Sequence, residues 1–109
     1  MPIELRLIRD EYGLEAEAVN PDYQLVAWFL GSDIQSNTRF ADEVLEAIDK
    51  IKAGQETEWV TGGNAHTLRL TPEKAVIEND VLDNVPPLEV SLDDLKQAVT
   101  QWRDFITQK

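Results

Sequence analysis

Hydrophobic and polar residues alternate at the start of the chain, which is the pattern of a half-buried strand. Three hydrophobic residues share one face of this first predicted strand: Ile3, Leu5 and Leu7. After a turn at residues 9–13, a second alternating segment covers residues 14–19 and sets Glu15 and Glu17 on its polar face. The two segments predict a β-hairpin, followed by a second turn at residues 20–22.

Residues 23–31 form a nearly continuous hydrophobic run. Such a run is typical of a strand buried on both faces, so we predict a third antiparallel strand here. From Phe40 the hydrophobic positions recur every three or four residues, which is the period of one helix face. Asn37 or Thr38 is the predicted N-cap of this helix, and Gly54 is its predicted end.

The second half of the chain repeats this order of elements. Strands are predicted at residues 57–61, 66–71 and 75–79, with turns at residues 62–64 and near residue 72. A last helix follows a less regular segment. The order βββα therefore occurs twice, although the two halves share few residues at matched positions.

The last helix is predicted from its N-terminal signals and its hydrophobic face. Ser91 and Asp94 have the spacing of a capping box, and Val90 and Leu95 have that of a hydrophobic staple. The buried face is predicted to consist of Leu92, Leu95, Val99, Trp102 and Ile106. Residues 79–90, which contain two prolines, are predicted to form a surface loop or crossover.

These elements predict an α+β fold for residues 1–109, organised as a single domain. It consists of two βββα-like units, with an antiparallel sheet packed against two helices. The chain has 109 residues, which is close to the commonest domain size. Hydrophobic residues make up 42% of it, enough for one core to offset the entropy of ordering the backbone.

The chain has a net charge of −11 and no cysteine. This charge repels phosphate backbones and anionic lipids, so we expect no nucleic-acid partner and no membrane association. The same field attracts a basic protein partner, while solubility alone is the alternative reason for it. The absence of cysteine excludes disulfides and thiol nucleophiles, and the lack of a signal-peptide pattern makes the cytoplasm the expected location.

Residues 58–70 contain a glycine pair, Asn64 and the single histidine, His66. A phosphate-binding loop leads directly into a helix, whereas Gly62 and Gly63 lead into a predicted strand. A hairpin turn, whose residues tolerate positive φ, is the better interpretation. Alternation turns His66 towards the same face as the leucines that follow it, which favours a partly buried structural histidine. A general base is the alternative, and it requires a nucleophile or an orienting carboxylate nearby.

Acidic residues supply the other candidate positions for a site or an interface. Glu15 and Glu17 lie on the hairpin, and Asp80 and Asp83 lie in the segment before the last helix. One histidine without cysteine makes a poor zinc site, and the acidic segment lacks the spacing and the central glycine of an EF-hand. We therefore assign no catalytic set, no metal site and no cofactor.

Short segments along most of the chain occur in a recognisable order: LIRDEYG, AWF, FADEVLEAIDKIKAG, HTLRL and WRDFITQK. In this order they resemble the bacterial YacL-type family of small uncharacterised proteins. None is a catalytic signature, and this chain has the short segment VLDNVPPLEV where members of that family carry a longer, more acidic one. The resemblance implies a compact α+β fold and transfers no functional residue.

Two functions from different classes remain open. The first is a non-enzymatic module that binds a protein partner, such as an adaptor, a regulator or an immunity protein that masks a basic toxin. The second is a small-ligand-binding protein or an enzyme that uses His66 with neighbouring carboxylates. A pocket with His66 and a carboxylate at its mouth favours the second, and a flat acidic face beside exposed aromatic residues favours the first. Trp28, Trp59 and Trp102 are either core residues or interface anchors, and the sequence leaves the oligomeric state open.

Overall fold

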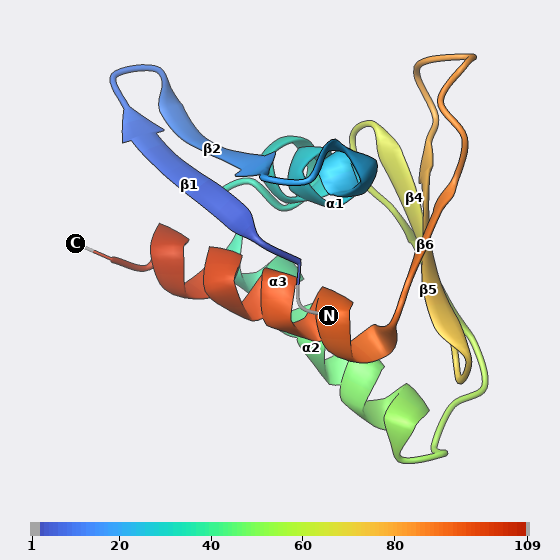
Figure 1. Cartoon of the computed structure of the whole chain (residues 1–109). Coiled ribbons are helices and arrows are strands. Elements are labelled where there is room, and N and C mark those ends of the chain that lie inside the picture. The colour runs from blue at the N-terminus through green and yellow to red at the C-terminus, as the bar shows by residue number, and fades with distance from the viewer. Residues whose placement is uncertain (1–2, 109) are drawn as a thin grey trace.

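Residues 3–108, which a computed structural model of the chain describes, contain two separate antiparallel sheets and three α-helices (Figure 1). The elements in chain order are β1 (Leu5–Asp10), β2 (Gly13–Ala18), the 3₁₀-helix η1 (Pro21–Tyr23), α1 (Gln24–Phe29), the π-helix η2 (Leu30–Ile34), α2 (Thr38–Lys52), β3 (Trp59–Gly62), β4 (His66–Thr71), β5 (Lys74–Asn79), β6 (Leu88–Val90) and α3 (Leu92–Ile106). The predicted α+β class is confirmed. Met1, Pro2 and Lys109 of the predicted domain lie outside the described residues.

The first sheet is the predicted hairpin of β1 and β2. Its register runs from Leu5 opposite Ala18 to Asp10 opposite Gly13. The turn is shorter than the sequence suggested, because Asp10 pairs within the ladder and its carboxylate accepts a hydrogen bond from the Tyr12 backbone N–H at 2.8 Å. Gly13 has a φ of 128°, which residues with a side chain rarely adopt. This glycine lets the chain reverse direction over two residues.

The third predicted strand is wrong, because residues 23–31 form the end of η1, the whole of α1 and the start of η2, so the first half of the chain is not a βββα unit. The Asn20 side chain accepts a hydrogen bond from the Asp22 N–H at 3.0 Å, and Pro21 occupies the first position of η1. Residues 20–22 are therefore a helix start and not a turn. A short hydrophobic run does not distinguish a buried strand from a buried helix. In the fold, α1 lies between the hairpin and the larger sheet (Figure 1), and the described chain has three α-helices where the sequence predicted two.

The second sheet contains β3, β4, β5 and β6 in that order, and each neighbouring pair is antiparallel. The three strands predicted in the second half are confirmed as β3, β4 and β5. The assignment of residues 79–90 entirely to a loop is wrong at its end, since Leu88–Val90 pair with β5 as the edge strand β6. This strand is too short for alternation to stand out after two prolines.

α2 and α3 begin at predicted caps. The Asn37 side chain accepts the Phe40 N–H at 3.1 Å, and Ser91 Oγ accepts the Asp94 N–H at 3.0 Å. Each cap satisfies an N–H group that lacks a partner in the first helical turn. Both helix predictions are therefore confirmed.

Ion pairs link the exposed sides of α2 and α3: Lys52 with Asp93, Lys96 with Asp49, and Arg103 with Asp42. The hydrogen bond from Lys52 lowers the pKa of Asp93, and the hydrogen bond to Asp49 raises the pKa of Lys96. Solvent screens exposed pairs such as these. The two helices are therefore held together mainly by the buried side chains between them.

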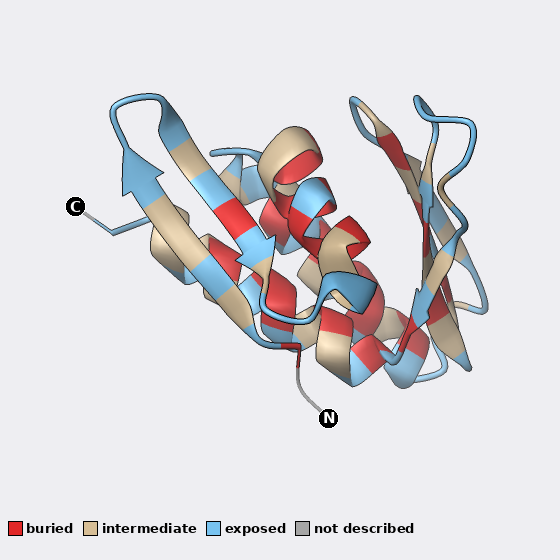
Figure 2. Cartoon of the chain, turned by 45° about the horizontal axis from the view of Figure 1, so that its top comes forward, coloured by how far each residue is buried: buried red, intermediate tan, exposed pale blue. Residues whose placement is uncertain are grey.

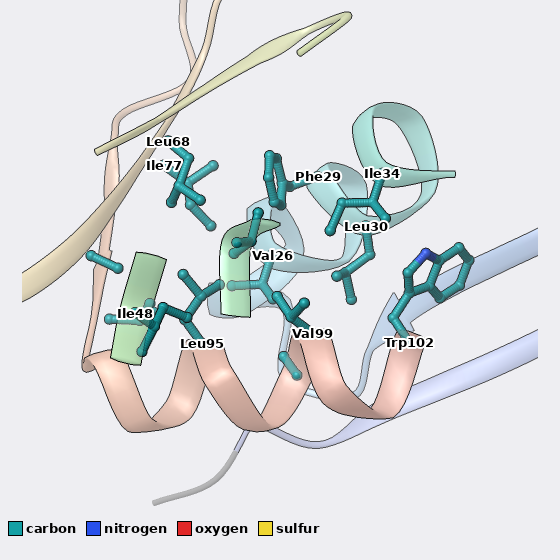
Figure 3. Packing of buried hydrophobic residues seen from close by; sticks show 14 of the residues in the cluster. Val26, Phe29, Leu30, Ile34, Ile48, Leu68, Ile77, Leu95, Val99 and Trp102 are labelled. Carbon is teal, nitrogen blue, oxygen red and sulfur yellow. The ribbon is translucent and has the colours of Figure 1, made fainter. Parts of the chain in front are cut away.

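The core lies where α1, η2, α2 and α3 meet one face of the larger sheet, as the buried residues in Figure 2 and the side chains in Figure 3 show. Trp102 is fully buried, and its Nε1 donates to the Gln35 carbonyl at 2.8 Å. Trp59 is partly buried and Trp28 is 41% exposed. Trp102 is therefore a core residue, whereas Trp28 leaves much of its ring available for contact.

Candidate functional site

His66 begins β4, and its side chain lies almost completely inside the protein. The residue is 2% exposed, and Leu68 and Leu70 on the same face of the strand are fully buried. Residues two and four apart in a strand share a face, which is why the sequence pattern predicted the burial of this histidine. The rings of Phe29 and His66 meet edge to face, with their centroids 6.4 Å apart. A polar ring in such surroundings requires hydrogen-bond partners.

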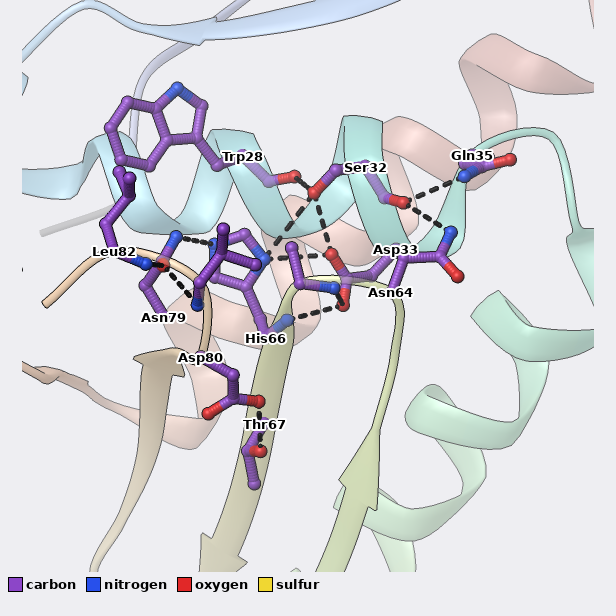
Figure 4. Close-up of polar contacts among 12 residues, drawn as sticks. Trp28, Ser32, Asp33, Gln35, Asn64, His66, Thr67, Asn79, Asp80 and Leu82 are labelled. Atoms are coloured by element: carbon purple, nitrogen blue, oxygen red, sulfur yellow. Dashed lines mark hydrogen bonds and ion pairs between the residues drawn. The ribbon is translucent and has the colours of Figure 1, made fainter.

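Asp33 of η2 is the first of these partners. Its side chain is fully buried, and both of its oxygens accept hydrogen bonds (Figure 4). Oδ1 lies 2.8 Å from His66 Nδ1, while Oδ2 accepts the backbone N–H of His66 at 2.9 Å and that of Ala65 at 3.2 Å. Ser32 Oγ lies 2.7 Å from Oδ1 and 2.6 Å from the Trp28 carbonyl, and its single proton serves one acceptor at a time. The carboxylate thus ties η2 to the start of β4.

Asn79 at the end of β5 is the second partner, and it determines which ring nitrogen of His66 carries the proton. Its Oδ1 accepts the backbone N–H groups of Val81 at 2.9 Å and Leu82 at 2.7 Å, so its amide nitrogen faces His66 Nε2 at 3.1 Å. An amide nitrogen donates and does not accept. Nε2 is therefore the acceptor, and the proton lies on Nδ1 and is donated to Asp33. The hydrogen-bond network assigns His66 as a neutral imidazole in this tautomer.

Ser32, Asp33, His66 and Asn79 together are called the polar cluster below. Their arrangement differs from that of a serine hydrolase, in which the nucleophile and the acid contact opposite nitrogens of the histidine. Here Ser32 Oγ lies 3.5 Å from Nδ1, the same nitrogen that Asp33 contacts. Nε2, which a general base would use, is occupied by Asn79. This geometry argues against His66 as the base that takes a proton from Ser32.

Gly63 packs directly against the polar cluster. A Cβ atom at this position would lie 2.1 Å from Asp33 Oδ2, whereas one at Gly62 would meet nothing within 4 Å. Neither glycine has a positive φ, so the turn does not use the backbone freedom that we expected of them. The hairpin itself is confirmed. Gly63 is needed because the buried carboxylate occupies the space of a side chain.

A cleft of about 670 Å³ lies beside the polar cluster. β2 forms one wall of the cleft, and α1 and η2 form another, which includes Trp28 and Ser32. The remaining lining residues include His66 at the start of β4, Asn79 at the end of β5, and Val81 and Leu82 just after β5. Three large hydrophobic residues at its mouth are unusually exposed: Trp28 at 41%, Val81 at 65% and Leu82 at 52%. Figure 4 shows Trp28 and Leu82 on the same side of His66.

The structure brings three of the five candidate residues together at this cleft. Glu15 and Glu17 of β2 and His66 of β4 all line it. Asp80 lies outside its lining, where its carboxylate accepts a hydrogen bond from Thr67 Oγ1 at 2.6 Å. Asp83 is exposed in the segment between β5 and β6 and also lies outside the lining.

The sequence reasoning missed Ser32, Asp33 and Asn79. Asp33 lies between the fully buried Leu30 and Ile34, and an acidic residue inside such a hydrophobic stretch is a signal that it is paired within the protein. The strand assigned to residues 23–31 hid this signal, since it left Asp33 in an unassigned connection.

Residues 3–108 contain no cluster of three or more histidine, aspartate or glutamate side chains arranged to hold a metal ion. Within the same residues, none of the helices has the length and hydrophobic composition that crossing a bilayer requires.

Comparison with known proteins adds one finding. A model of an uncharacterised protein family, UPF0231, matches residues 3–106. No curated protein and no solved structure matches the chain.

Proposed function

The chain belongs to the uncharacterised protein family UPF0231, and from the geometry of its cleft we propose that it is a non-enzymatic module that binds a partner protein. The bound part of the partner is a segment that carries both basic and hydrophobic side chains. An adaptor, a regulator or an immunity-type protein would all act in this way. The finer assignment to YacL-type bacterial proteins and the cytoplasmic location are parts of the same proposal.

The observation that carries the proposal is the chemistry of the two sides of the cleft. β2 contributes the carboxylates of Glu15 and Glu17, while the side formed by α1 and the residues after β5 contributes exposed hydrophobic side chains. Exposed hydrophobic residues gathered at one site mark interaction surfaces. A segment with lysine or arginine beside hydrophobic residues matches both sides at once.

The net charge of −11 supports a basic partner over an acidic one. Charge complementarity raises the rate of encounter and excludes wrong partners. Glu17 is already paired with Arg6 at 3.2 Å, with both side chains exposed. No ion pair involves Glu15 within residues 3–108. Glu15 is therefore the carboxylate at the cleft that a partner's cation reaches first.

Binding is favoured over catalysis because His66 is not available as a base. Its Nδ1 faces Asp33 and its Nε2 faces Asn79, and the ring is buried. A catalytic histidine needs a free nitrogen within reach of the substrate proton. In the proposed function His66 instead positions Asn79 and, through it, the backbone of Val81 and Leu82 at the mouth.

A selection from a random displayed-peptide library tests this function. We expect the peptides that bind the wild-type chain to be enriched in lysine or arginine together with aliphatic or aromatic residues. Their binding should weaken in the double variant Glu15→Gln with Glu17→Gln, because the cleft then loses both carboxylates. Association should also slow as salt rises, since ions screen the attraction.

The matched control is Glu43→Gln with Glu73→Gln, which changes the net charge equally at exposed positions outside the cleft lining. Peptide binding that weakens equally in both double variants would show that the net charge of the protein attracts the peptides and that the carboxylates of the cleft have no specific role. Selected peptides without an excess of basic residues would contradict the proposal.

A small-ligand-binding protein is the second candidate function, because the cleft volume lies within the range of small-molecule sites, roughly 300 to 1,000 Å³. Short alkylammonium ions are suitable probes, since they combine one cation with a hydrophobic chain. Saturable binding of such ions in the cleft, without selection of any peptide, would favour this candidate over the first.

A further inference from the structure

The outer edge of β2 is unpaired within the part of the chain that the structure describes. β2 forms a ladder with β1 alone. Just beyond the strand, the Val19 N–H donates to the Glu4 carbonyl on the β1 side at 3.0 Å, whereas the Ala18 N–H donates to Gln24 Oε1 at 3.3 Å. The N–H and C=O groups of one residue in a strand point to the same edge, and those of the next residue point to the opposite edge. The N–H and C=O groups of Leu14 and Ala16 therefore point away from β1, as the Ala18 N–H does.

This free edge borders the cleft. Leu14, Glu15, Ala16 and Glu17 follow one another in β2, and all of them line it. Successive side chains of a strand point to opposite faces, so one face of a strand would supply only alternate residues. A strand that contributes four consecutive residues borders the cleft with its edge, where the backbone groups of Leu14 and Ala16 are directed.

The two faces of β2 differ in chemistry. Glu15 and Glu17 are exposed on one face, while Ala16 on the other face is 9% exposed and belongs to the hydrophobic core, to which α1 also contributes. A strand laid beside β2 would have the same two faces. Its side chains on the first face would lie next to carboxylates, and those on the second would point towards α1, which carries Trp28.

Resting on the function proposed above, we propose that the partner binds as an extended segment that adds a third strand to the hairpin along β2. The backbone of the segment pairs with the N–H and C=O groups of Leu14 and Ala16. Its basic side chains face Glu15 and Glu17, and the alternate hydrophobic side chains lie over Trp28 and the neighbouring mouth of the cleft. In strand addition, backbone bonds supply affinity and the alternate side chains supply specificity.

The partner chemistry follows from cross-strand pairing. Opposite charges on neighbouring strands stabilise a sheet, and like charges oppose pairing. An acidic segment is therefore excluded from this edge, and so is a second β2 strand from another copy of the chain, because it would set Glu15 and Glu17 against their own equivalents. A segment in which basic and hydrophobic residues alternate is the matching occupant.

A synthetic peptide tests the mode of binding. The probe is a short acetylated and amidated peptide in which valine and lysine alternate, titrated into the full chain by calorimetry. Two derivatives are compared with it, one N-methylated at the valine amides and the other at the lysine amides. In an added strand, one of these sets of amides faces β2 and the other faces solvent.

We expect one derivative to bind about as well as the parent and the other to bind at least about ten-fold more weakly, because methylation removes donors that pair with β2. Equal binding of all three peptides, sensitive to Glu15→Gln with Glu17→Gln, would overturn strand addition and leave the proposed function standing. Failure of the parent peptide to bind would overturn this inference, while the library selection would still decide the proposed function on its own.

Ala16→Pro tests the same inference from the side of the protein. The Ala16 N–H points away from β1, so proline here removes no bond of the β1–β2 ladder, and edge positions of this kind tolerate proline. We expect a folded variant that binds the parent peptide at least about ten-fold more weakly. Full binding by a folded Ala16→Pro variant would overturn the inference, and the methylated peptides decide the question if this variant does not fold. A dimer observed in sedimentation experiments and dissociated by Ala16→Pro would also overturn the inference, because the strand added to β2 would then come from a second copy of the chain.

Discussion

The polar cluster and the mouth of the cleft lie next to each other, yet polar side chains are buried in the first and hydrophobic side chains are exposed in the second. In the cluster, polar groups are buried and every buried side-chain nitrogen or oxygen among the described residues has a partner. At the mouth, Trp28, Val81 and Leu82 are hydrophobic and exposed. The same segments supply both regions, since the continuous helical stretch of α1 and η2 carries Trp28 and Asp33 and the end of β5 leads from Asn79 to Val81.

This contrast separates what stabilises the fold from what is free to bind. Buried polar groups rigidify a structure when every member is satisfied, whereas exposed hydrophobic side chains gathered at one site indicate contact with another molecule. Asn79 joins the two regions, because its amide nitrogen faces His66 and its oxygen accepts the N–H groups of Val81 and Leu82. The cluster therefore sets the shape of the mouth from the inside, and substitutions in the two regions should have different consequences.

The largest effect is expected for Asp33→Ala in the polar cluster. This change removes the acceptor for two backbone N–H groups and for the His66 ring proton; the two groups of His66 are buried and the Ala65 N–H is partly buried. We expect a loss of at least roughly 3 kcal/mol in the free energy of unfolding, measured by urea denaturation, because each donor left without an acceptor inside the protein costs roughly 1–3 kcal/mol. Asp83→Ala is the control at an exposed aspartate and should change stability by less than about 0.5 kcal/mol. Similar values for the two variants would contradict the role of the cluster.

Asn79→Ala should affect both regions. It leaves His66 Nε2 without a donor and removes the acceptor for two backbone N–H groups, so we expect a loss of roughly 1–3 kcal/mol. Because the backbone of Val81 and Leu82 loses its anchor, the alternating valine and lysine peptide should also bind more weakly. Asn84→Ala is the control at an exposed asparagine in the same segment. A destabilised variant that binds normally would show that the mouth does not depend on the cluster.

Gly63→Ala tests the packing against Asp33. The added Cβ would lie 2.1 Å from Oδ2, so the carboxylate or the turn must move. We expect a loss of roughly 1–3 kcal/mol in denaturation experiments, as is typical of overpacking. Gly62→Ala makes the same change next to it, where a Cβ meets nothing within 4 Å. Equal stability of the two variants would contradict the tight approach of Gly63 to the cluster.

Gly63 also shows why part of the site could not be predicted. The pattern around it predicted a hairpin, and the structure confirms that hairpin. The local sequence holds no information about Asp33, which lies thirty positions earlier in the chain and reaches the turn through the tertiary fold. His66 was likewise predicted from local alternation to be partly buried, whereas its partners, which come from other parts of the chain, were not identified.

The fold was predicted well wherever a clear hydrophobic period was present. β4 alternates strictly, and α2 and α3 combine hydrophobic faces with caps at Asn37 and Ser91. Residues 23–31 have neither period, because this segment is buried on nearly all sides and its hydrophobic residues are continuous. The helix signal there was Asn20 before Pro21, and it was interpreted as a turn because both residues are common in turns.

Ser91→Ala acts at the start of α3, outside both the polar cluster and the mouth of the cleft. It removes the side-chain acceptor for the Asp94 N–H at the start of α3, and we expect a loss of about 1 kcal/mol. Gln97→Ala, at an exposed position of the same helix, is the control. Peptide binding should be unchanged in Ser91→Ala. Weaker binding would mean that general destabilisation, and not damage to the cleft, explains the result for Asn79→Ala.

The smallest effect on stability, with a clear effect on binding, is expected for Val81→Ser at the mouth. Val81 is 65% exposed, so replacing it removes few buried contacts, and the free energy of unfolding should change by less than about 0.5 kcal/mol. The alternating peptide should nevertheless bind more weakly, since its hydrophobic side chains lose part of the surface that they cover. Val60→Ser makes the same chemical change at a position that is 44% exposed on β3 and outside the cleft lining, and it should leave binding intact. If the two variants bind the peptide equally well, the mouth contributes no specific contact, and the separation between a stabilising cluster and a binding mouth would have to be abandoned.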